Sequence, residues 1–120
     1  MATKDSNFAM WQPFDNGSSI GKLGSENGTI VCDEEHIDGA RITLERDGGT
    51  APFSITCGIY GWMVHTPFFS NEAEAQQEFD KMQVSLDQIL RRIPLLEEPD
   101  LDAKMEAAKR AISTFVEQYP

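Results

Sequence analysis

The sequence predicts a single α+β domain, spanning residues 1–120, in which an antiparallel sheet is followed by two helices. Apolar residues alternate with polar ones in short runs up to Ser70, and they recur every three or four positions from Asn71 onward. Alternation is typical of half-buried strands, and the longer repeat is typical of amphipathic helices. Because the strands come first and the connections are short, we expect a meander of four or five strands with two antiparallel helices packed on one of its faces.

The first 17 residues are expected to form an irregular arm. Pro13 and the turn-forming residues 15–17 exclude a long helix here. Trp11 and Phe14 are the large aromatic side chains of the arm, and each can bury enough area to anchor it. The arm is therefore predicted to cover an edge of the core.

The strands are expected between residues 18 and 69. A weak strand over 18–23 precedes a glycine-containing loop, and residues 29–36 and 40–47 form the clearest hairpin. The most apolar segment begins at Phe53 and alternates regularly at first. Its phase is lost after Gly61, so the chain either continues as one strand bent by a bulge or folds back as a separate strand.

The register of the hairpin follows from the cost of burying charge. A two-residue turn would place two carboxylates on the apolar face, which costs more than any turn preference. A three-residue turn over 37–39 instead pairs Cys32 with Leu44 and Glu35 with Arg41. We prefer this second register, which puts four apolar side chains on one face: Ile30, Cys32, Ile42 and Leu44.

The two helices are expected at residues 71–93 and 99–119. Asn71, with a glutamate three residues later, resembles a capping box, and Pro94 ends the first helix. Pro99 occupies a favoured first position of the second helix. Each helix has one apolar stripe, so both must pack on another layer.

The net charge of −10, from 20 acidic and 10 basic residues, argues against binding to nucleic acids or anionic membranes. Such binding needs clustered lysines and arginines, which the sequence lacks. No apolar run approaches the roughly 18 residues of a membrane span, and the N-terminus does not resemble an export signal. We therefore expect a cytoplasmic protein with reduced cysteines.

The sequence offers no constellation that is specific for catalysis, and no metal or cofactor is expected. Cys32, His36, Cys57 and His65 formally complete a zinc set, but Cys32 and His36 would lie about 13 Å apart on an extended strand. Cys57 is predicted to face inward, so a nucleophilic pair with His65 has little support, and enzymatic activity is not the favoured hypothesis.

The densest charge cluster, residues 33–36, is best explained as the solvated face of a strand. Neighbouring side chains on a strand point to opposite faces, so only Asp33 and Glu35 could converge. Glu35 is expected to pair across the strands with Arg41.

The strongest interaction signal lies on the outward parity of the apolar segment. If Cys57 and its alternating neighbours face the helices, then Thr56, Tyr60 and Trp62 face away from them. Tyrosine and tryptophan beside small residues are typical of an interface. The N-terminal arm could cover this surface with Trp11 and Phe14. Otherwise the surface binds a protein partner or a second copy of the chain, or it forms a small-molecule site.

Two other functions remain open from the sequence. A pocket between a curved sheet and the helices, lined by Met63, Phe79 and Met82, could bind a small molecule. The acidic charge alone could suit an inhibitor or immunity-type protein that binds a basic partner. A non-catalytic module for protein interaction or self-association is the favoured hypothesis.

Overall fold

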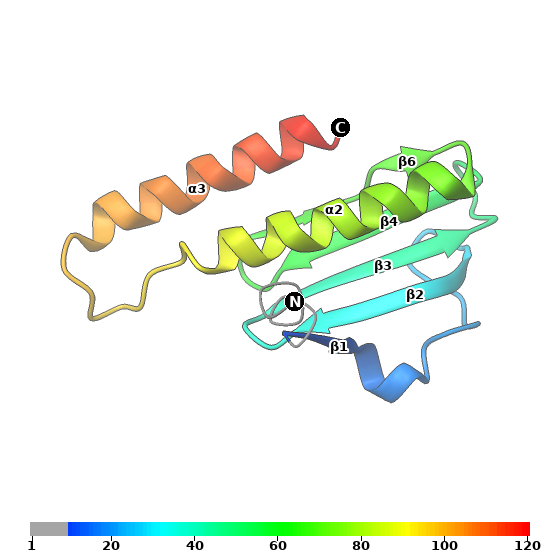
Figure 1. Cartoon of the computed structure of the whole chain (residues 1–120), viewed down its shortest axis with the longest axis horizontal. Coiled ribbons are helices and arrows are strands. Elements are labelled where there is room, and N and C mark those ends of the chain that lie inside the picture. The colour runs from blue at the N-terminus through cyan, green and yellow to red at the C-terminus, as the bar shows by residue number, and fades with distance from the viewer. Residues whose placement is uncertain (1–9) are drawn as a thin grey trace, which may run out of the picture.

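The computed structural model describes residues 10–120, which form one antiparallel sheet of six strands with helices on one side (Figure 1). The strands follow the order β1-β2-β3-β4-β5, and β6 pairs with β4 farther along the edge that β5 occupies. The elements are β1 (Trp11–Pro13), the 3-10 turn η1 (Phe14–Gly17), β2 (Thr29–His36), β3 (Ala40–Arg46), β4 (Phe53–Ile59), β5 (Met63–His65), β6 (Phe68–Phe69), α2 (Glu72–Leu90) and α3 (Leu101–Gln118).

The predicted α+β class and the order of strands followed by helices are confirmed. The apolar segment is resolved as three strands rather than one bent strand. The chain reverses over residues 60–62, because Gly61 adopts a left-handed φ of 83° and the amide of Trp62 donates to the carbonyl of Ile59. The sheet therefore has more strands than the four or five that were expected.

The predicted hairpin register is also confirmed. Cys32 lies opposite Leu44, and Glu35 lies opposite Arg41, with Gly39 at a left-handed φ of 107° in the turn. The placement of Ile30 was wrong, however. The register shifts between Ile30 and Cys32, so Ile30 lies opposite Glu45 and faces away from the helices.

The described part of the N-terminal arm is anchored by Trp11, as predicted, but residues 11–13 join the sheet as β1 instead of remaining irregular. Trp11 pairs with His36 as part of β1, and its ring meets the His36 ring edge-on at 4.9 Å. Trp11 is thus buried on the helix-covered side. The weak strand at 18–23 was wrong as well, since turns occupy that segment apart from one bridge between Leu23 and Thr29. Residues 1–9 of the predicted arm lie outside the described residues.

The capping of the first helix is confirmed, because the Asn71 side chain accepts a 2.8 Å hydrogen bond from the amide of Glu74. Both helices are shorter than expected. The first ends at Leu90, and the second starts at Leu101 because Asp100 is left-handed, with φ of 56°.

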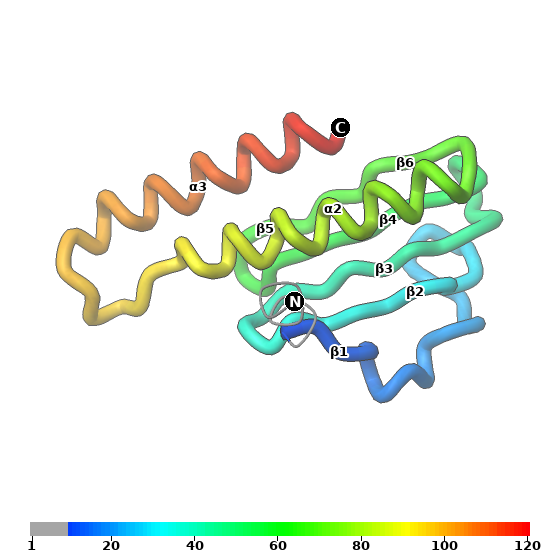
Figure 2. The backbone as a smooth tube through the Cα atoms, in the orientation of Figure 1, coloured from blue at the N-terminus to red at the C-terminus, as the bar shows by residue number. Residues whose placement is uncertain are grey.

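The two helices are placed differently relative to the sheet (Figure 2). α2 lies across β3 and β4 and buries Met82 and Leu86 completely, whereas α3 packs beside α2 and fully buries only Ala108 and Phe115 within its length. Each large aliphatic side chain buried in this layer stabilises the fold by about 1.5–3 kcal/mol. Within residues 10–120, neither helix is long and apolar enough to cross a membrane. The opposite face of the sheet, which we call the outer face, is the one away from α2.

Candidate functional site on the outer face of the sheet

The outer face carries a pocket of about 710 Å³, which we call the outer-face pocket. Its floor is formed by β3 and β4, including Arg41, Thr43 and Thr56. The loop at residues 23–25 forms one wall, and the turn and strand at residues 60–64 form the other. The pocket therefore depends on segments that are about 35 residues apart in sequence.

Three exposed apolar side chains surround the pocket. Leu23 is 73% exposed, Tyr60 is 54% exposed and Val64 is 79% exposed. Water contacts most of the surface of these groups, although each could bury a large apolar area against a partner. Scattered exposed apolar residues are common, but apolar residues around a shared depression are typical of a binding surface.

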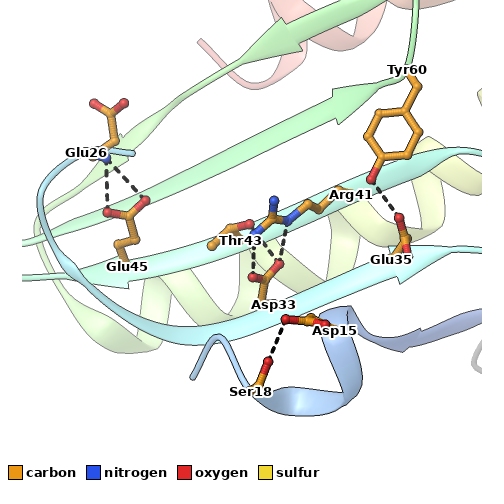
Figure 3. Close-up of polar contacts among 9 residues, drawn as sticks. All are labelled: Asp15, Ser18, Glu26, Asp33, Glu35, Arg41, Thr43, Glu45 and Tyr60. Carbon is orange, nitrogen blue, oxygen red and sulfur yellow. Dashed lines mark hydrogen bonds and ion pairs between the residues drawn. The ribbon is translucent and has the colours of Figure 1, made fainter. Parts of the chain in front are cut away.

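Arg41, on the floor of the pocket, forms an ion pair with the buried carboxylate of Asp33 (Figure 3). Asp33, whose side chain is 0% exposed, accepts hydrogen bonds from Arg41 Nε at 2.9 Å and Nη2 at 2.7 Å, and another from Thr43 Oγ1 at 3.0 Å. The guanidinium also stacks on the Phe14 ring, 3.5 Å from its centroid. Hydrogen bonding to Asp33 raises the pKa of Arg41 further, so both charges are held in place.

The predicted pairing of Glu35 with Arg41 was wrong, although the two residues lie opposite each other. A buried carboxylate is costly to leave unpaired, so Arg41 turns to Asp33 instead. Glu35 accepts a 2.8 Å hydrogen bond from the hydroxyl of Tyr60. Partial desolvation and then this contact with Glu35 raise the pKa of Tyr60 to about 12, so its hydroxyl remains a donor at neutral pH.

One wall of the pocket is held by a second buried carboxylate. Glu45 is 1% exposed, and its Oε1 accepts from the amides of Gly28 at 3.0 Å and Glu26 at 3.1 Å. A Cβ at Gly24 would lie 2.3 Å from Glu45 Cδ, so a larger residue there would push the carboxylate away from its present position. Sequence reasoning missed these hydrogen bonds between the loop and Glu45, and the glycine-rich loop was the only local signal for them.

The predicted interaction residues do not all lie together. Thr56 and Tyr60 line the outer-face pocket, as their parity predicts. Trp62 lines one end of it, but this side chain is half-buried, packs against the core and borders a hollow beside Met105 of α3. The turn at residues 60–62 breaks the alternation on which its placement was based. Trp11, buried beside His36, does not belong to this surface.

The side chains assigned to the alternative ligand pocket lie in the packed interior. Phe79 and Met82 are 4% and 0% exposed and belong to the hydrophobic core, while Met63 packs against it. These side chains occupy the space that the hypothesis assigned to a small molecule between the sheet and the helices. The only substantial hollow that involves Met63 is the outer-face pocket, among the pockets described for residues 10–120.

Cys57 and His65 are directly opposite in the sheet, but their chemistry does not resemble a nucleophilic pair. The Cys57 thiol donates to the backbone carbonyl of His65 at 3.4 Å, and His65 Nε2 contacts the carbonyl of Tyr119. Burial raises the pKa of Cys57 to about 12, which keeps the thiol protonated at neutral pH.

The other histidine is also engaged within the fold. His36 Nε2 lies 2.7 Å from Asp87 Oδ1, and His36 Nδ1 accepts from the amide of Asp38 at 3.0 Å. This contact joins the end of the hairpin to α2. Within residues 10–120, no three His, Cys, Asp or Glu side chains form a group that could hold a metal ion.

Comparisons of the chain with protein-family models, with curated proteins and with solved structures found no match. The geometry of the outer face is therefore the main evidence for the function of this chain.

Proposed function

We propose that this chain is a non-catalytic protein-binding domain whose outer sheet face holds the partner. The observation that carries this proposal is the exposed apolar rim of Leu23, Tyr60 and Val64 around a pocket on the outer face. Hydrogen bonds inside the fold hold the carboxylates of Asp33 and Glu45, so the surface around the pocket is formed before a partner binds. A preformed surface avoids part of the ordering cost of binding.

The chemistry of the face favours binding over catalysis. A catalytic acid, base or nucleophile needs an available polar group with a pKa suited to its task. On this face, Asp33 and Glu45 are engaged by donors, Tyr60 retains its proton, and Arg41 is committed to Asp33. Its ionisable groups therefore act mainly as structural supports.

A protein is favoured over a small molecule because of the width of the site. The pocket reaches from Ile30 on β2 to Val64 on β5, which is three strand spacings, or about 14 Å at roughly 4.8 Å each. Its rim residues project at the two sides instead of closing over an enclosed volume. Both cysteines are free, which supports the proposed cytoplasmic location.

The test is affinity capture from native extract, combined with light scattering of the purified protein. The bait variants are wild type, Tyr60→Ala/Val64→Ser, and Val84→Ser as a control on the exposed side of α2. We expect one protein to be captured in stoichiometric amount by the wild type and the control, and at least tenfold less by the double variant.

A wild-type dimer that the double variant cannot form would identify a second copy as the partner and would also support the proposal. Equal capture by all three baits would contradict it, as would a monomeric wild type that captures nothing. Thermal unfolding of each bait shows whether a loss of capture reflects a loss of folding.

A further inference from the structure

The two acidic residues of β2 on the outer face differ in how their charge is compensated. Asp33 receives two hydrogen bonds from Arg41 and one from Thr43. Glu35 stands at the exposed end of the face, and its described hydrogen-bond partner is the neutral hydroxyl of Tyr60. Since Arg41 turns to Asp33, the charge of Glu35 remains available to a cation from outside.

The net charge of the ionisable groups around Glu35 on the outer face is also negative. The face holds three carboxylates and one guanidinium, Asp33, Glu35, Glu45 and Arg41, so their formal sum is −2. In the adjoining loop, Lys22 and Glu26 cancel each other. The chain as a whole carries −10, so its long-range field also favours a basic partner.

The Tyr60 ring adds a second means of recognising a cation. Its hydroxyl donates to the Glu35 carboxylate at 2.8 Å, while the residue as a whole is more than half exposed. A lysine or arginine side chain could therefore pair with the carboxylate and pack its charged group or its aliphatic stem on the ring. Leu23 and Val64 offer apolar contacts on the two sides of the same pocket.

The size of the face selects a segment rather than a broad protein surface. Strands β3 and β4 each have seven residues, so the floor measures roughly 23 Å by 14 Å, or about 300 Å² as a flat area. A standard interface buries about 800 Å² on each partner. An extended segment of about five residues would span the pocket at 3.3 Å per residue.

We infer that the partner inserts an extended segment whose lysine or arginine contacts Glu35 and Tyr60 and whose aliphatic side chains contact Leu23 and Val64. This inference rests on the proposed function, because it specifies what binds at the outer-face pocket and at Glu35, which lies beside the pocket on Tyr60. The predicted ligand is thus a basic peptide segment, which is complementary in charge to this strongly acidic chain. Binding should weaken as salt is added, since Glu35 lies near solvent.

The experiment uses a phage library of random heptapeptides as the probe, followed by affinity measurements on synthetic versions of the enriched peptides. The selection is run on wild type, Glu35→Gln, Tyr60→Ala/Val64→Ser and a matched control, Glu97→Gln. Glu97 is exposed in the loop between the helices. The glutamine at position 35 still accepts the Tyr60 hydroxyl, so only the charge is removed.

We expect wild type and Glu97→Gln to enrich peptides with a basic residue at a constant position next to an aliphatic one. Glu35→Gln should bind these peptides at least tenfold more weakly, and raising NaCl from 50 to 500 mM should weaken wild-type binding more than that of Glu35→Gln.

The outcomes separate the inference from the proposed function. Peptides that depend on Tyr60 and Val64 but lack a basic residue, or that bind Glu35→Gln equally well, would overturn the basic-segment inference alone. Peptides that bind the double variant as well as the wild type, or no enrichment at all, would overturn both. Unfolding curves of all four proteins exclude misfolding as the cause.

Discussion

The two faces of this sheet differ in the kind of side chain that they bury and in how those side chains are stabilised. The face under α2 buries aliphatic side chains such as Leu44, Ile55 and Leu86, and its stability comes from the removal of apolar surface from water. The outer face instead buries two carboxylates, Asp33 and Glu45, and satisfies each with donors from the chain itself. The apolar core under α2 stabilises the fold. The hydrogen-bonded carboxylates hold the outer face in place, and the apolar side chains at the rim of its pocket stay exposed.

Residues that pack in the core alternate with residues that face the pocket along a single strand. On β3, Ile42 and Leu44 face the helix, while Arg41, Thr43 and Glu45 face the pocket. Because adjacent residues serve opposite layers, mutations on the two faces should have separable effects on unfolding and on binding.

The largest expected effect is a loss of stability on the helix-covered side. Leu86→Ala removes a side chain that is 0% exposed and leaves a cavity, so it should reduce the free energy of unfolding by about 2–5 kcal/mol. Val84→Ala, two residues earlier on α2 and 43% exposed, is the control and should cost less than about 1 kcal/mol. Urea denaturation measures both, and similar losses would show that α2 does not pack as described.

The next effect probes the wall of the outer-face pocket. Gly24→Ala places a Cβ against the Glu45 carboxylate and should lower the free energy of unfolding by about 1–3 kcal/mol, partly through lost hydrogen bonds to the loop amides. Gly49→Ala, which has open space and no left-handed φ, should change it by less than about 0.5 kcal/mol. Chemical denaturation compares the two variants.

A double-mutant cycle tests whether the Glu45 carboxylate causes this loss of stability. In a Glu45→Ala background, Gly24→Ala should cost less than it does in the wild type, because the clashing carboxylate is gone. Additive losses in the cycle would mean that the cost of Gly24→Ala does not come from a clash with the Glu45 carboxylate.

The smallest effect is a dependence of stability on alkaline pH. Burial raises the pKa of Cys57 from 9.0 to about 12, so the unfolded chain loses this proton first as the pH rises. The stabilisation is complete below pH 9.0 and is lost progressively between pH 9.0 and about 12, with a limiting slope of about 1.4 kcal/mol per pH unit. Urea denaturation at pH 8, 9 and 10 should show a shallower decline for Cys57→Ala, and equal slopes would contradict a buried, protonated thiol.

Sequence reasoning succeeded where one energetic term dominated locally. The cost of placing carboxylates on an apolar face was enough to select the three-residue turn and the pairing of Cys32 with Leu44. The cap at Asn71 and the outward parity of Thr56 likewise depend on neighbours close in the chain. These features could be predicted because alternation and capping are properties of short segments.

The failures all involve partners that are distant or a break in periodicity. The shift between Ile30 and Cys32 and the turn before Met63 interrupt the period-two pattern. Ile30 was therefore assigned to the wrong face, and the packing of Trp62 against the core was missed. Arg41 has two acidic candidates, and only the burial of Asp33 in the assembled sheet decides between them.

By itself, the sequence determined the class of the fold, the order of its layers, the register of the central hairpin and the acidic charge, because each follows from local patterns or from composition. Tertiary structure alone decided the pairing of β1, the hydrogen bonds between Glu45 and the loop at 24–28, and the ion pair that leaves Glu35 available. These depend on desolvation, and the extent to which a group is desolvated is set only when distant segments pack together.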